Sequence, residues 1–380
     1  MNAGLESSTA HPAPDVRARL RKASAAAVST VARHFALDRQ LGFWMREVHP
    51  AWSLTELYAR VVDVVQETHD VKSFVLEPNR RWPGHRAGQF VMVEVEIAGV
   101  RMERCYSLSS APGNPRIAIT VKRVGGGRVS SWLHDHVRPG HVLRLGRPAG
   151  NFVLPAPAPR KLLLLSGGSG VTPVMSILRD LVSRDAVHDV VFVHAARSAR
   201  DVIFGNELEQ LARRHPGLRL AIFLDDALSF SGPLDRMKLQ ASVPDLAERE
   251  TFLCGPQGMM DALSPIWSEA GIVDRLKIER FLPKYALEPA ETSVPATVEL
   301  KLLRAGRSVV ADGRGTLLEQ LERAGEKPVY GCRMGICNTC RCRKSAGVVE
   351  DIVTGAVSTA GDEDIRLCTS RARTDLELVV

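Results

Sequence analysis

The sequence predicts a multidomain protein that combines an antiparallel β-barrel, an α/β domain with a parallel sheet, and a small α+β unit. Short alternating strands fill residues 58–154, and from residue 161 onward apolar runs alternate with helix-like stretches. Cysteines crowd together near the C-terminus, where a third unit is expected. A length of 380 residues fits this division, because one domain usually takes roughly 100–200 residues.

Composition narrows the functional classes. The chain is 45% hydrophobic and 24% charged, as ordinary globular proteins are. Its 50 basic and 43 acidic side chains give a net charge of +7, which offers no positive support for nucleic-acid binding. No apolar run approaches the ~20 residues of a membrane span, and no secretory signal is recognisable. We therefore expect a cytoplasmic or membrane-peripheral protein.

Residues 1–54 are predicted to form a basic N-terminal extension. The pattern of Arg, Lys, Ala and Val over Val16–Phe35 is typical of a short amphipathic helix. Such a helix either packs on the adjacent domain or docks to a membrane or a protein partner.

Residues 55–155 are predicted to form the barrel. Their Val-rich strands are separated by Pro, Gly and Asn, with no long helices between them, which is typical of an antiparallel barrel. We expect these strands at Leu57–Val65, Val71–Glu77, Phe90–Ile97 and Arg116–Val124.

Residues 156–285 are predicted to form the α/β domain, with helices on both faces of the sheet. A glycine-rich turn leads into a helical stretch that extends through Leu181. The expected strands are Lys161–Leu165, Val190–His194, Leu218–Phe223 and Thr251–Cys254. Residues 286–296 have the composition of a linker, and residues 297–380 make the third unit.

Four cysteines in this third unit have the spacing of a plant-type [2Fe–2S] site. They are Cys332, Cys337, Cys340 and Cys368, with four, two and twenty-seven residues between them. Gly331 and Gly335 allow tight backbone turns around such a cluster. A structural zinc site is the alternative, but zinc motifs usually contain two separated Cys-x2-Cys pairs, and this stretch has one. Cys342 is left over, and we expect it to be a structural or surface thiol.

Arg104, Tyr106 and Ser107 lie at the end of a predicted barrel strand and suit a flavin. The aromatic ring would stack on the isoalloxazine, the hydroxyl would reach its N5 atom, and the guanidinium would bind phosphate. The same residues also fit an ordinary barrel strand with polar ends. The stretch Gly125–Leu133 favours the flavin, because its glycines precede a predicted helix start whose N–H groups suit phosphate.

Two further turns indicate a nicotinamide nucleotide. Ser166–Pro173 follows a strand and precedes a helix, so its N–H groups can face a pyrophosphate. It lacks the G-x-G-x-x-G fingerprint, which disfavours an ordinary Rossmann dehydrogenase. Cys254–Met259 follows a later strand, at the edge where α/β sheets bind ligands. Taken alone, each turn also fits a purely structural role.

In this order the motifs resemble the ferredoxin–NADP reductase superfamily over residues 55–380, with a plant-type ferredoxin appended from Thr297 onward. The resemblance implies a β-barrel flavin domain, an α/β nucleotide domain and a β-grasp ferredoxin domain. It implies FAD, with FMN as the alternative, a [2Fe–2S] cluster on the four spaced cysteines, and NADPH or NADH as electron donor. Asn338 departs from the small residues common at its position, which affects polarity rather than ligation.

The resemblance also implies roles for individual residues. Tyr106, Ser107 and Cys254 would serve catalysis, the last by positioning the nicotinamide rather than as a nucleophile. The residues expected to bind FAD are Arg104, Tyr106, Ser107, Val129 and Ser130, with Glu279 and Phe281 near the flavin. Those expected to bind the nicotinamide nucleotide are Gly167, Gly168, Gly170, Thr172, Pro173, Cys254, Gly255 and Pro256.

Arg197, Ser198 and Arg200 follow the second strand of the α/β domain, where this superfamily reads the adenosine ribose. By that likeness they would pair with a 2′-phosphate and favour NADPH, and no acidic residue for NADH is evident. NADH stays the alternative donor.

NAD(P)H gives two electrons as a hydride whereas a [2Fe–2S] centre takes one at a time, and a flavin converts between the two. We therefore expect an NAD(P)H-dependent oxidoreductase that passes electrons to a separate acceptor protein. The aromatic-bearing extension resembles that of bacterial reductases serving membrane-bound fatty-acyl-CoA desaturases, so a desaturase is the expected acceptor. The alternatives are a soluble Rieske or di-iron oxygenase and, in a different class, a redox-sensing or binding protein that carries the cluster without turnover.

Overall fold

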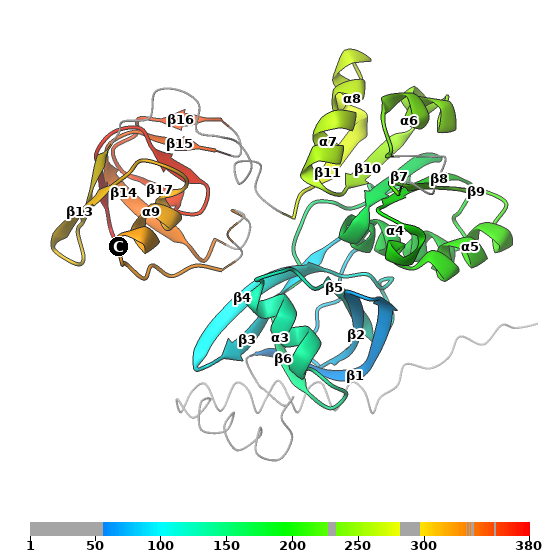
Figure 1. Ribbon diagram of the computed structural model, residues 1–380, viewed down its shortest axis with the longest axis horizontal. Helices are drawn as coiled ribbons and strands as arrows, with labels where there is room; N and C mark the ends of the chain where they lie inside the picture. Colours follow the sequence, from blue (N-terminus) through cyan, green and yellow to red (C-terminus); the bar gives the residue numbers. More distant parts are fainter. Residues whose placement is uncertain are drawn as a thin grey trace, which may run out of the picture.

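The computed structural model describes residues 56–226, 233–281, 297–331, 333, 335, 338–352 and 355–380. Figure 1 shows them as a barrel in blue and cyan, an α/β domain in green and yellow, and a C-terminal domain in orange and red. The expected N-terminal helix and the expected linker at 286–296 lie outside the described residues. Within the described ranges, no helix is both long enough and apolar enough to cross a membrane.

The first domain is an antiparallel β-barrel. Its strands are β1 (Leu57–Thr68), β2 (Val71–Pro78), β3 (Phe90–Ile97), β4 (Val100–Ser107), β5 (Ile117–Lys122) and β6 (Val142–Leu145). They pair in the order β4-β3-β6-β1-β2-β5, antiparallel throughout. A bridge between Leu108, just after β4, and Ile119 of β5 joins the two outer strands. The sheet therefore closes on itself, which removes its exposed edges.

Alternation of apolar and polar residues builds the barrel core. Leu57, Ala59 and Val61 of β1 are buried, while the residues between them are partly exposed. Helix α3 (Arg128–His136) adds Val129 and Leu133, four residues apart on one face, to the same core. The helix contacts β3 and β4, the second of which carries the predicted flavin residues.

The second domain is a parallel sheet with helices on both faces. Its strands are β7 (Lys161–Gly167), β8 (Asp189–Ala196), β9 (Leu218–Leu224), β10 (Glu250–Cys254) and β11 (Leu276–Glu279). They pair in the order β11-β10-β7-β8-β9. The helical segments are η1 (Gly168–Gly170), α4 (Val171–Ser183), η2 (Ala199–Asp201), α5 (Gly205–Arg214), α6 (Arg236–Ser242), η3 (Leu246–Glu248), α7 (Gln257–Leu263), α8 (Pro265–Glu269) and η4 (Val273–Arg275).

Burial on both faces explains the unbroken apolar run of β7. Leu162 and Leu164 belong to the core formed with α4 and α5, whereas Leu163 and Leu165 belong to the core formed with α6, α7 and α8. A strand covered on both sides has no solvent-facing position and therefore shows no polar alternation.

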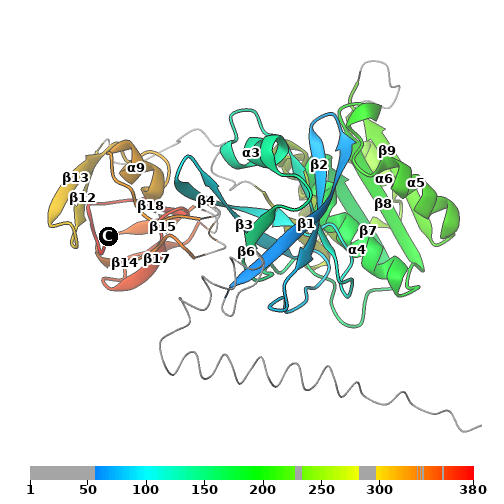
Figure 2. The ribbon, with the colours of Figure 1, turned by 90° about the horizontal axis from the view of Figure 1, so that it is seen from below.

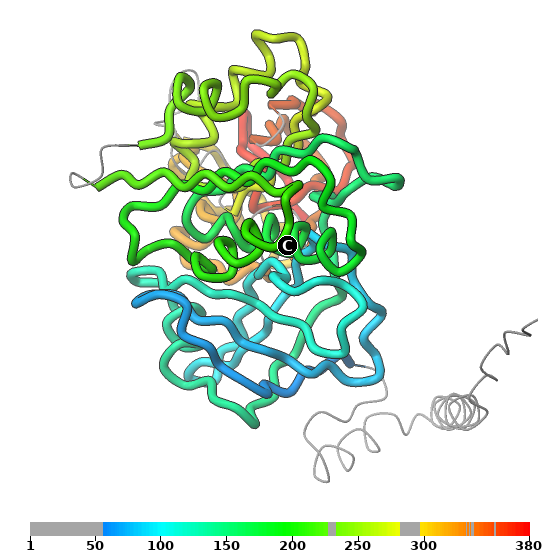
Figure 3. Tube along the Cα trace, turned by 90° about the vertical axis from the view of Figure 1, so that its right-hand side faces the viewer, coloured from blue at the N-terminus to red at the C-terminus, as the bar shows by residue number. Residues whose placement is uncertain are grey.

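Helix α4 fastens the barrel to the α/β domain. The Arg179 guanidinium donates to the backbone oxygen of Ser109 at 2.6 Å, and the Ser176 hydroxyl donates to that of Ser110 at 2.7 Å. Val71 and Phe152 of the first domain are part of the core that contains α4. Figures 2 and 3 show the two domains side by side along this contact.

The C-terminal domain has the predicted β-grasp arrangement, in which a helix packs on a mixed sheet. A five-stranded sheet has the order β13-β12-β19-β14-β17, with β12 and β19 parallel, beside a three-stranded sheet of order β16-β15-β18. Helix α9 (Leu317–Arg323) begins with a capping box between Thr316 and Glu319. The strands are β12 (Val298–Leu302), β13 (Arg307–Ala311), β14 (Arg341–Ala346), β15 (Val349–Asp351), β16 (Val357–Ser358), β17 (Glu363–Arg366), β18 (Ser370–Ala372) and β19 (Leu376–Leu378). All three predicted fold classes are thus confirmed.

Candidate functional site

From β7 the chain continues to one side of the sheet through β8 and β9, and it then returns to the other side of β7 with β10 and β11. The direction in which strands are added therefore reverses at β7. In an open α/β sheet, the carboxyl ends of the strands flanking such a reversal form a crevice for ligands. The two predicted nucleotide turns meet there, one after β7 and the other after β10. Turn η1 also contacts β5 of the barrel, so the crevice adjoins the predicted flavin domain.

The two turns touch through their backbones. A Cβ atom on Gly170 would lie 2.2 Å from the carbonyl oxygen of Cys254, and one on Gly255 would lie 2.4 Å from Cε of Met259. A Cβ atom on Gly167 would lie 2.8 Å from Sδ of the same methionine. Glycine is therefore required at Gly170, where the close neighbour is backbone, whereas at Gly167 and Gly255 the end of the Met259 side chain would have to shift. The absence of side chains on these turns leaves backbone N–H groups accessible to a pyrophosphate.

The remaining residues of these turns set their shape. Gly168 has a φ of +50°, a conformation that glycine adopts without strain. The Thr172 hydroxyl donates to the backbone oxygen of Ser169 at 3.0 Å and closes the first turn of α4, which also buries Pro173. Pro256 is the N-cap of α7 and continues the second turn into a helix.

Cys254 and Glu279 lie opposite each other in the register of β10 and β11. Cys254 is fully buried; burial raises the pKa of its thiol well above the ordinary value, and the nearby Glu279 carboxylate raises it further. The thiol stays protonated, so it can donate a hydrogen bond but is a poor nucleophile. Burial also raises the pKa of Glu279 to about 7. Phe281, just beyond β11, packs against the core that contains α4.

Strand β4 carries the predicted flavin residues. Arg104 and Tyr106 share one face of the strand and are half-buried, whereas Ser107 faces the other way and is buried. The Arg104 guanidinium donates to the backbone oxygen of Glu103 at 2.7 Å. The Tyr106 ring packs against the barrel core. This burial raises the pKa of the Tyr106 phenol, which is therefore neutral. This arrangement suits a flavin: its ring system could stack on the neutral Tyr106 ring, and its phosphates could pair with the Arg104 guanidinium.

The start of α3 has the features of a phosphate-binding cradle. No side chain caps this helix and its first turn holds no acidic residue, so its first N–H groups have no partner inside the helix. The backbone N–H of Val124 donates to the Ser130 hydroxyl at 3.2 Å, which folds the glycine loop over the helix start. Open space surrounds Gly125 and Gly126. The cradle therefore fits the pyrophosphate of a dinucleotide flavin.

The three residues predicted to read a 2′-phosphate are not gathered together. Arg197 and Ser198 both bond to Asp201, at 2.8 Å and 2.6 Å respectively. Arg200 instead lines a cavity of about 710 Å³ formed by β1, α5 and β9. Sequence reasoning missed Asp201; its spacing of four residues from Arg197 was the available signal.

Cys340 and Cys368 of the predicted cluster lie together in the C-terminal domain. Both are buried, and the backbone N–H of Leu367 donates to the backbone oxygen of Cys340 at 3.1 Å. The N–H of Gly335 donates to Sγ of Cys368 at 3.2 Å. Such N–H donation to sulfur stabilises thiolate charge, as an iron–sulfur cluster requires. Gly335 has a φ of +72°, and a Cβ atom there would lie 2.6 Å from Cγ2 of Thr369.

Of the other three cysteines of this domain, the structure describes only Cys342. Cys332 and Cys337 lie outside the described residues. Cys342 is on β14, buried in the domain core, and burial raises the pKa of its thiol to about 11. Of the two expected roles, a structural or a surface thiol, its buried position fits the structural one.

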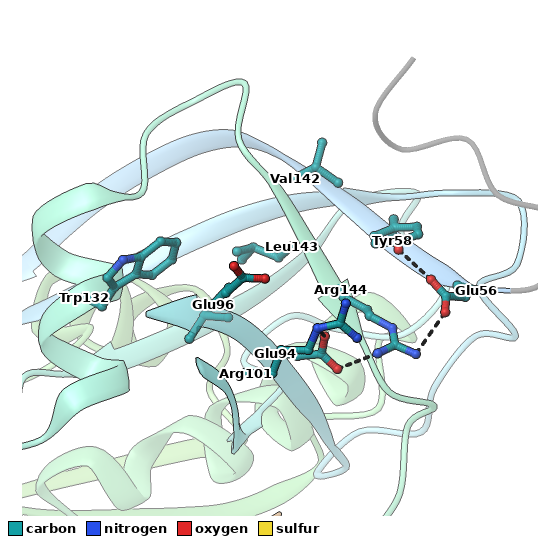
Figure 4. Close-up of a pocket in the computed structure, with 10 residues that line it drawn as sticks. Glu56, Tyr58, Glu94, Glu96, Arg101, Trp132, Val142, Leu143 and Arg144 are labelled. Carbon is teal, nitrogen blue, oxygen red and sulfur yellow. Dashed lines mark hydrogen bonds and ion pairs between the residues drawn. The ribbon is translucent and has the colours of Figure 1, made fainter. Parts of the chain in front are cut away.

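A separate cavity of about 490 Å³ lies on the outer face of the barrel (Figure 4). An ion-pair network crosses it, in which Arg144 contacts Glu94 and Glu56, and Tyr58 donates to Glu56. Trp132 of α3 forms one side. None of the predicted flavin or nucleotide residues lines this cavity, so its size does not mark the redox site.

Comparison with known families gives one match to each domain. Residues 58–154 match the oxidoreductase FAD-binding domain, residues 164–264 the oxidoreductase NAD-binding domain, and residues 300–373 the 2Fe-2S iron-sulfur cluster binding domain. These matches confirm the predicted FAD, nicotinamide nucleotide and [2Fe–2S] cluster, and their order along the chain.

Similar proteins share this order. The chain is 39% identical to an NADPH oxidoreductase of Mycobacterium tuberculosis, over 88% of this chain and 87% of that protein. It is 36% identical to a glycine betaine monooxygenase reductase subunit of Pseudomonas aeruginosa, over 83% of this chain and 91% of that one. Phthalate dioxygenase reductase has the same fold, with a TM-score of 0.59 and 22% identity over 86% of this chain and 98% of that structure.

We predict that Gly170→Ala raises the KM for NADH by about tenfold or more, because the added methyl group forces the two nucleotide turns apart. Steady-state kinetics with circular dichroism as a folding check measure this. Gly258→Ala is the matched control, since a Cβ atom there meets nothing within 4 Å. An unchanged KM in Gly170→Ala would contradict the backbone contact.

We predict that Glu279→Gln stabilises the protein at pH 8 by about 2–5 °C in Tm but not at pH 4.5. The pKa of Glu279 is raised from 4.5 to about 7, so the folded state binds an extra proton between these values and loses stability as pH rises through them. Thermal unfolding across this range measures the difference. Glu96→Gln is the control, because it makes the same replacement at an exposed glutamate. A Tm difference in Glu279→Gln that does not change with pH would refute the raised pKa of Glu279.

We predict that Cys368→Ser abolishes the iron–sulfur absorbance of the purified protein while NADH still reduces its flavin. The serine hydroxyl is a poor replacement for a thiolate that accepts an N–H bond from Gly335. Cys342→Ala is the control and should keep the cluster, because Cys342 stands outside the plant-type cysteine spacing and its thiol donates to the backbone oxygen of Arg343. Loss of the cluster in the control alone would reverse the ligand assignment.

Proposed function

This chain belongs to the three-domain reductases that carry FAD-binding, NAD-binding and 2Fe-2S domains, and on that premise we propose that it reduces a separate oxygenase component at the expense of NAD(P)H. The order of the three domains supports this proposal most strongly, because it is the order of a reductase that ends in an iron–sulfur carrier. A relative of similar length is the reductase subunit of a monooxygenase.

Each domain contributes residues with a distinct task. When bound, a flavin accepts a hydride and releases electrons singly, which links a two-electron donor to a one-electron cluster. The turns around Gly170 and Gly255 hold the nucleotide, and the protonated Cys254 thiol can orient its nicotinamide. Arg179 and Ser176 keep the nucleotide domain against the barrel, so the two reacting rings meet in a fixed geometry.

The residues of the C-terminal domain hold the carrier. Burial of Cys340 and Cys368 excludes water, and the N–H of Gly335 offsets thiolate charge. A relative of this chain is a reductase subunit of a monooxygenase, which supports transfer of the electrons to another protein.

The oxygenase is favoured over the desaturase as acceptor. The desaturase prediction rested on the N-terminal extension, which lies outside the described residues. One of the two relatives named above is the reductase subunit of a monooxygenase, and the other is named only as an NADPH oxidoreductase. Neither name refers to a desaturase. The third class, a binding protein without turnover, is disfavoured by the intact crevice for a nicotinamide nucleotide.

Reconstitution separates these acceptors. We expect the holoprotein with NADH or NADPH to support product formation by the oxygenase component of a glycine betaine monooxygenase, and to support no desaturation by a membrane-bound acyl-CoA desaturase. Cys368→Ser is the control that keeps the flavin and should transfer nothing to the oxygenase. Desaturated product without hydroxylated product would overturn the proposed acceptor, and absence of any NAD(P)H oxidation would favour the binding protein.

A further inference from the structure

Asp201 bonds to two of the three side chains that were expected to bind a 2′-phosphate, those of Arg197 and Ser198. Its Oδ1 atom accepts from Nη2 of Arg197 at 2.8 Å, and its Oδ2 atom accepts from the Ser198 hydroxyl at 2.6 Å. The side chain of Asp201 is 8% exposed, whereas that of Arg197 is 66% exposed. A buried carboxylate therefore binds the Nη2 atom of an arginine whose side chain is otherwise largely exposed.

A second carboxylate reaches the same guanidinium from the barrel. Oδ2 of Asp70, in the turn between β1 and β2, lies 3.7 Å from Nη2 of Arg197 and 2.8 Å from Nζ of Lys122. His69 lies 4.0 Å from Asp201 and 3.8 Å from Asp70. The carboxylates of Asp70 and Asp201 thus balance the charges of Arg197 and Lys122. These four side chains together offer no excess positive charge to a phosphate.

The hydroxyl of Ser198 is also unavailable as a donor. A hydroxyl has one hydrogen, and here Asp201 accepts it. A phosphate dianion accepts hydrogen bonds and repels a neighbouring carboxylate, so it would have to displace this bond and tolerate Asp201. A ribose 2′-hydroxyl is different, because it donates to a carboxylate, which is how acidic residues after the second strand select NADH.

The charge state of Asp201 agrees with this role. Burial alone would raise its pKa, but the hydrogen bonds from Ser198 and Arg197 outweigh that effect and leave the pKa lowered. Its carboxylate is therefore ionised at neutral pH. Arg200 offers no compensation, since it lines the cavity between β1, α5 and β9 rather than this cluster.

We propose that Asp201 is a specificity-determining residue that engages Arg197 and Ser198 and so disfavours NADPH relative to NADH. The inference deepens the proposed function, since it rests on a nicotinamide nucleotide binding beside the second strand of the α/β domain. It revises the preference for NADPH that Arg197, Ser198 and Arg200 suggested in the sequence. Asp201 acts from the turn η2 by engaging Arg197 and Ser198, not by binding the ribose from the end of β8.

The test compares nucleotide affinities in the oxidised holoprotein. Isothermal titration with NAD⁺ and NADP⁺ gives the ratio of the two Kd values for the wild type and for Asp201→Asn. We expect the substitution to shift this ratio toward NADP⁺ by about three- to tenfold, through stronger NADP⁺ binding. The ratio of kcat/KM for NADPH to that for NADH should rise by a similar factor. Asp201→Ser is a second uncharged variant, in case the amide disturbs the turn.

Two control variants identify the groups involved. Asp70→Asn removes the more distant partner of Arg197 without touching Ser198, and should shift the ratio less. Arg197→Ala combined with Asp201→Asn should cancel the gain, because the freed guanidinium is then absent. An unchanged ratio in both Asp201 variants, or a shift toward NAD⁺, would overturn the proposal. In either case NADH would still reduce the flavin; failure of both nucleotides to bind the wild type would instead refute the proposed function.

Discussion

The backbone contact between the two nucleotide turns is the constraint on which the redox site depends. A Cβ atom on Gly170 would stand 2.2 Å from the carbonyl oxygen of Cys254, so the first turn can carry no side chain there. This contact exists only because β7 and β10 are neighbours at the reversal of strand order. It aligns the start of α4 with the Cys254–Glu279 pair, and the same turn touches β5 of the barrel.

Rigid coupling of the barrel and the nucleotide domain follows from the same region. Arg179 and Ser176 of α4 donate to consecutive backbone oxygens just after β4, the strand that carries Tyr106. Hydride transfer needs reacting atoms about 3–3.5 Å apart, so a helix that bonds to both halves of the site is a direct way to keep that geometry. The iron–sulfur domain has its own hydrophobic core, which supports the cysteine segment around Cys340 and Cys368.

The fold and the cofactor classes were predictable because their signals are local. The first three cysteines, the glycine turns and the alternation in β1 each lie within a short stretch of sequence, and only Cys368 stands apart. Strand β6 was not delimited, since its four residues carry little pattern and its place between β3 and β1 depends on pairing across the barrel. Asp201 was missed for a similar reason: its bond to Arg197 appears only when η2 folds back, and sequence alone shows two arginines and a serine that resemble a phosphate site.

An anaerobic absorbance titration of the holoprotein with NADH, and separately with NADPH, tests the central claim most directly. We expect the flavin and iron–sulfur bands both to bleach, because electrons would pass from the nucleotide crevice through the barrel's flavin to the cysteine domain. Titration with NADH should reach completion at lower nucleotide excess than titration with NADPH. If neither nucleotide bleaches the flavin, the crevice at Gly170 and Cys254 is not a site for NAD(P)H, and the account is contradicted.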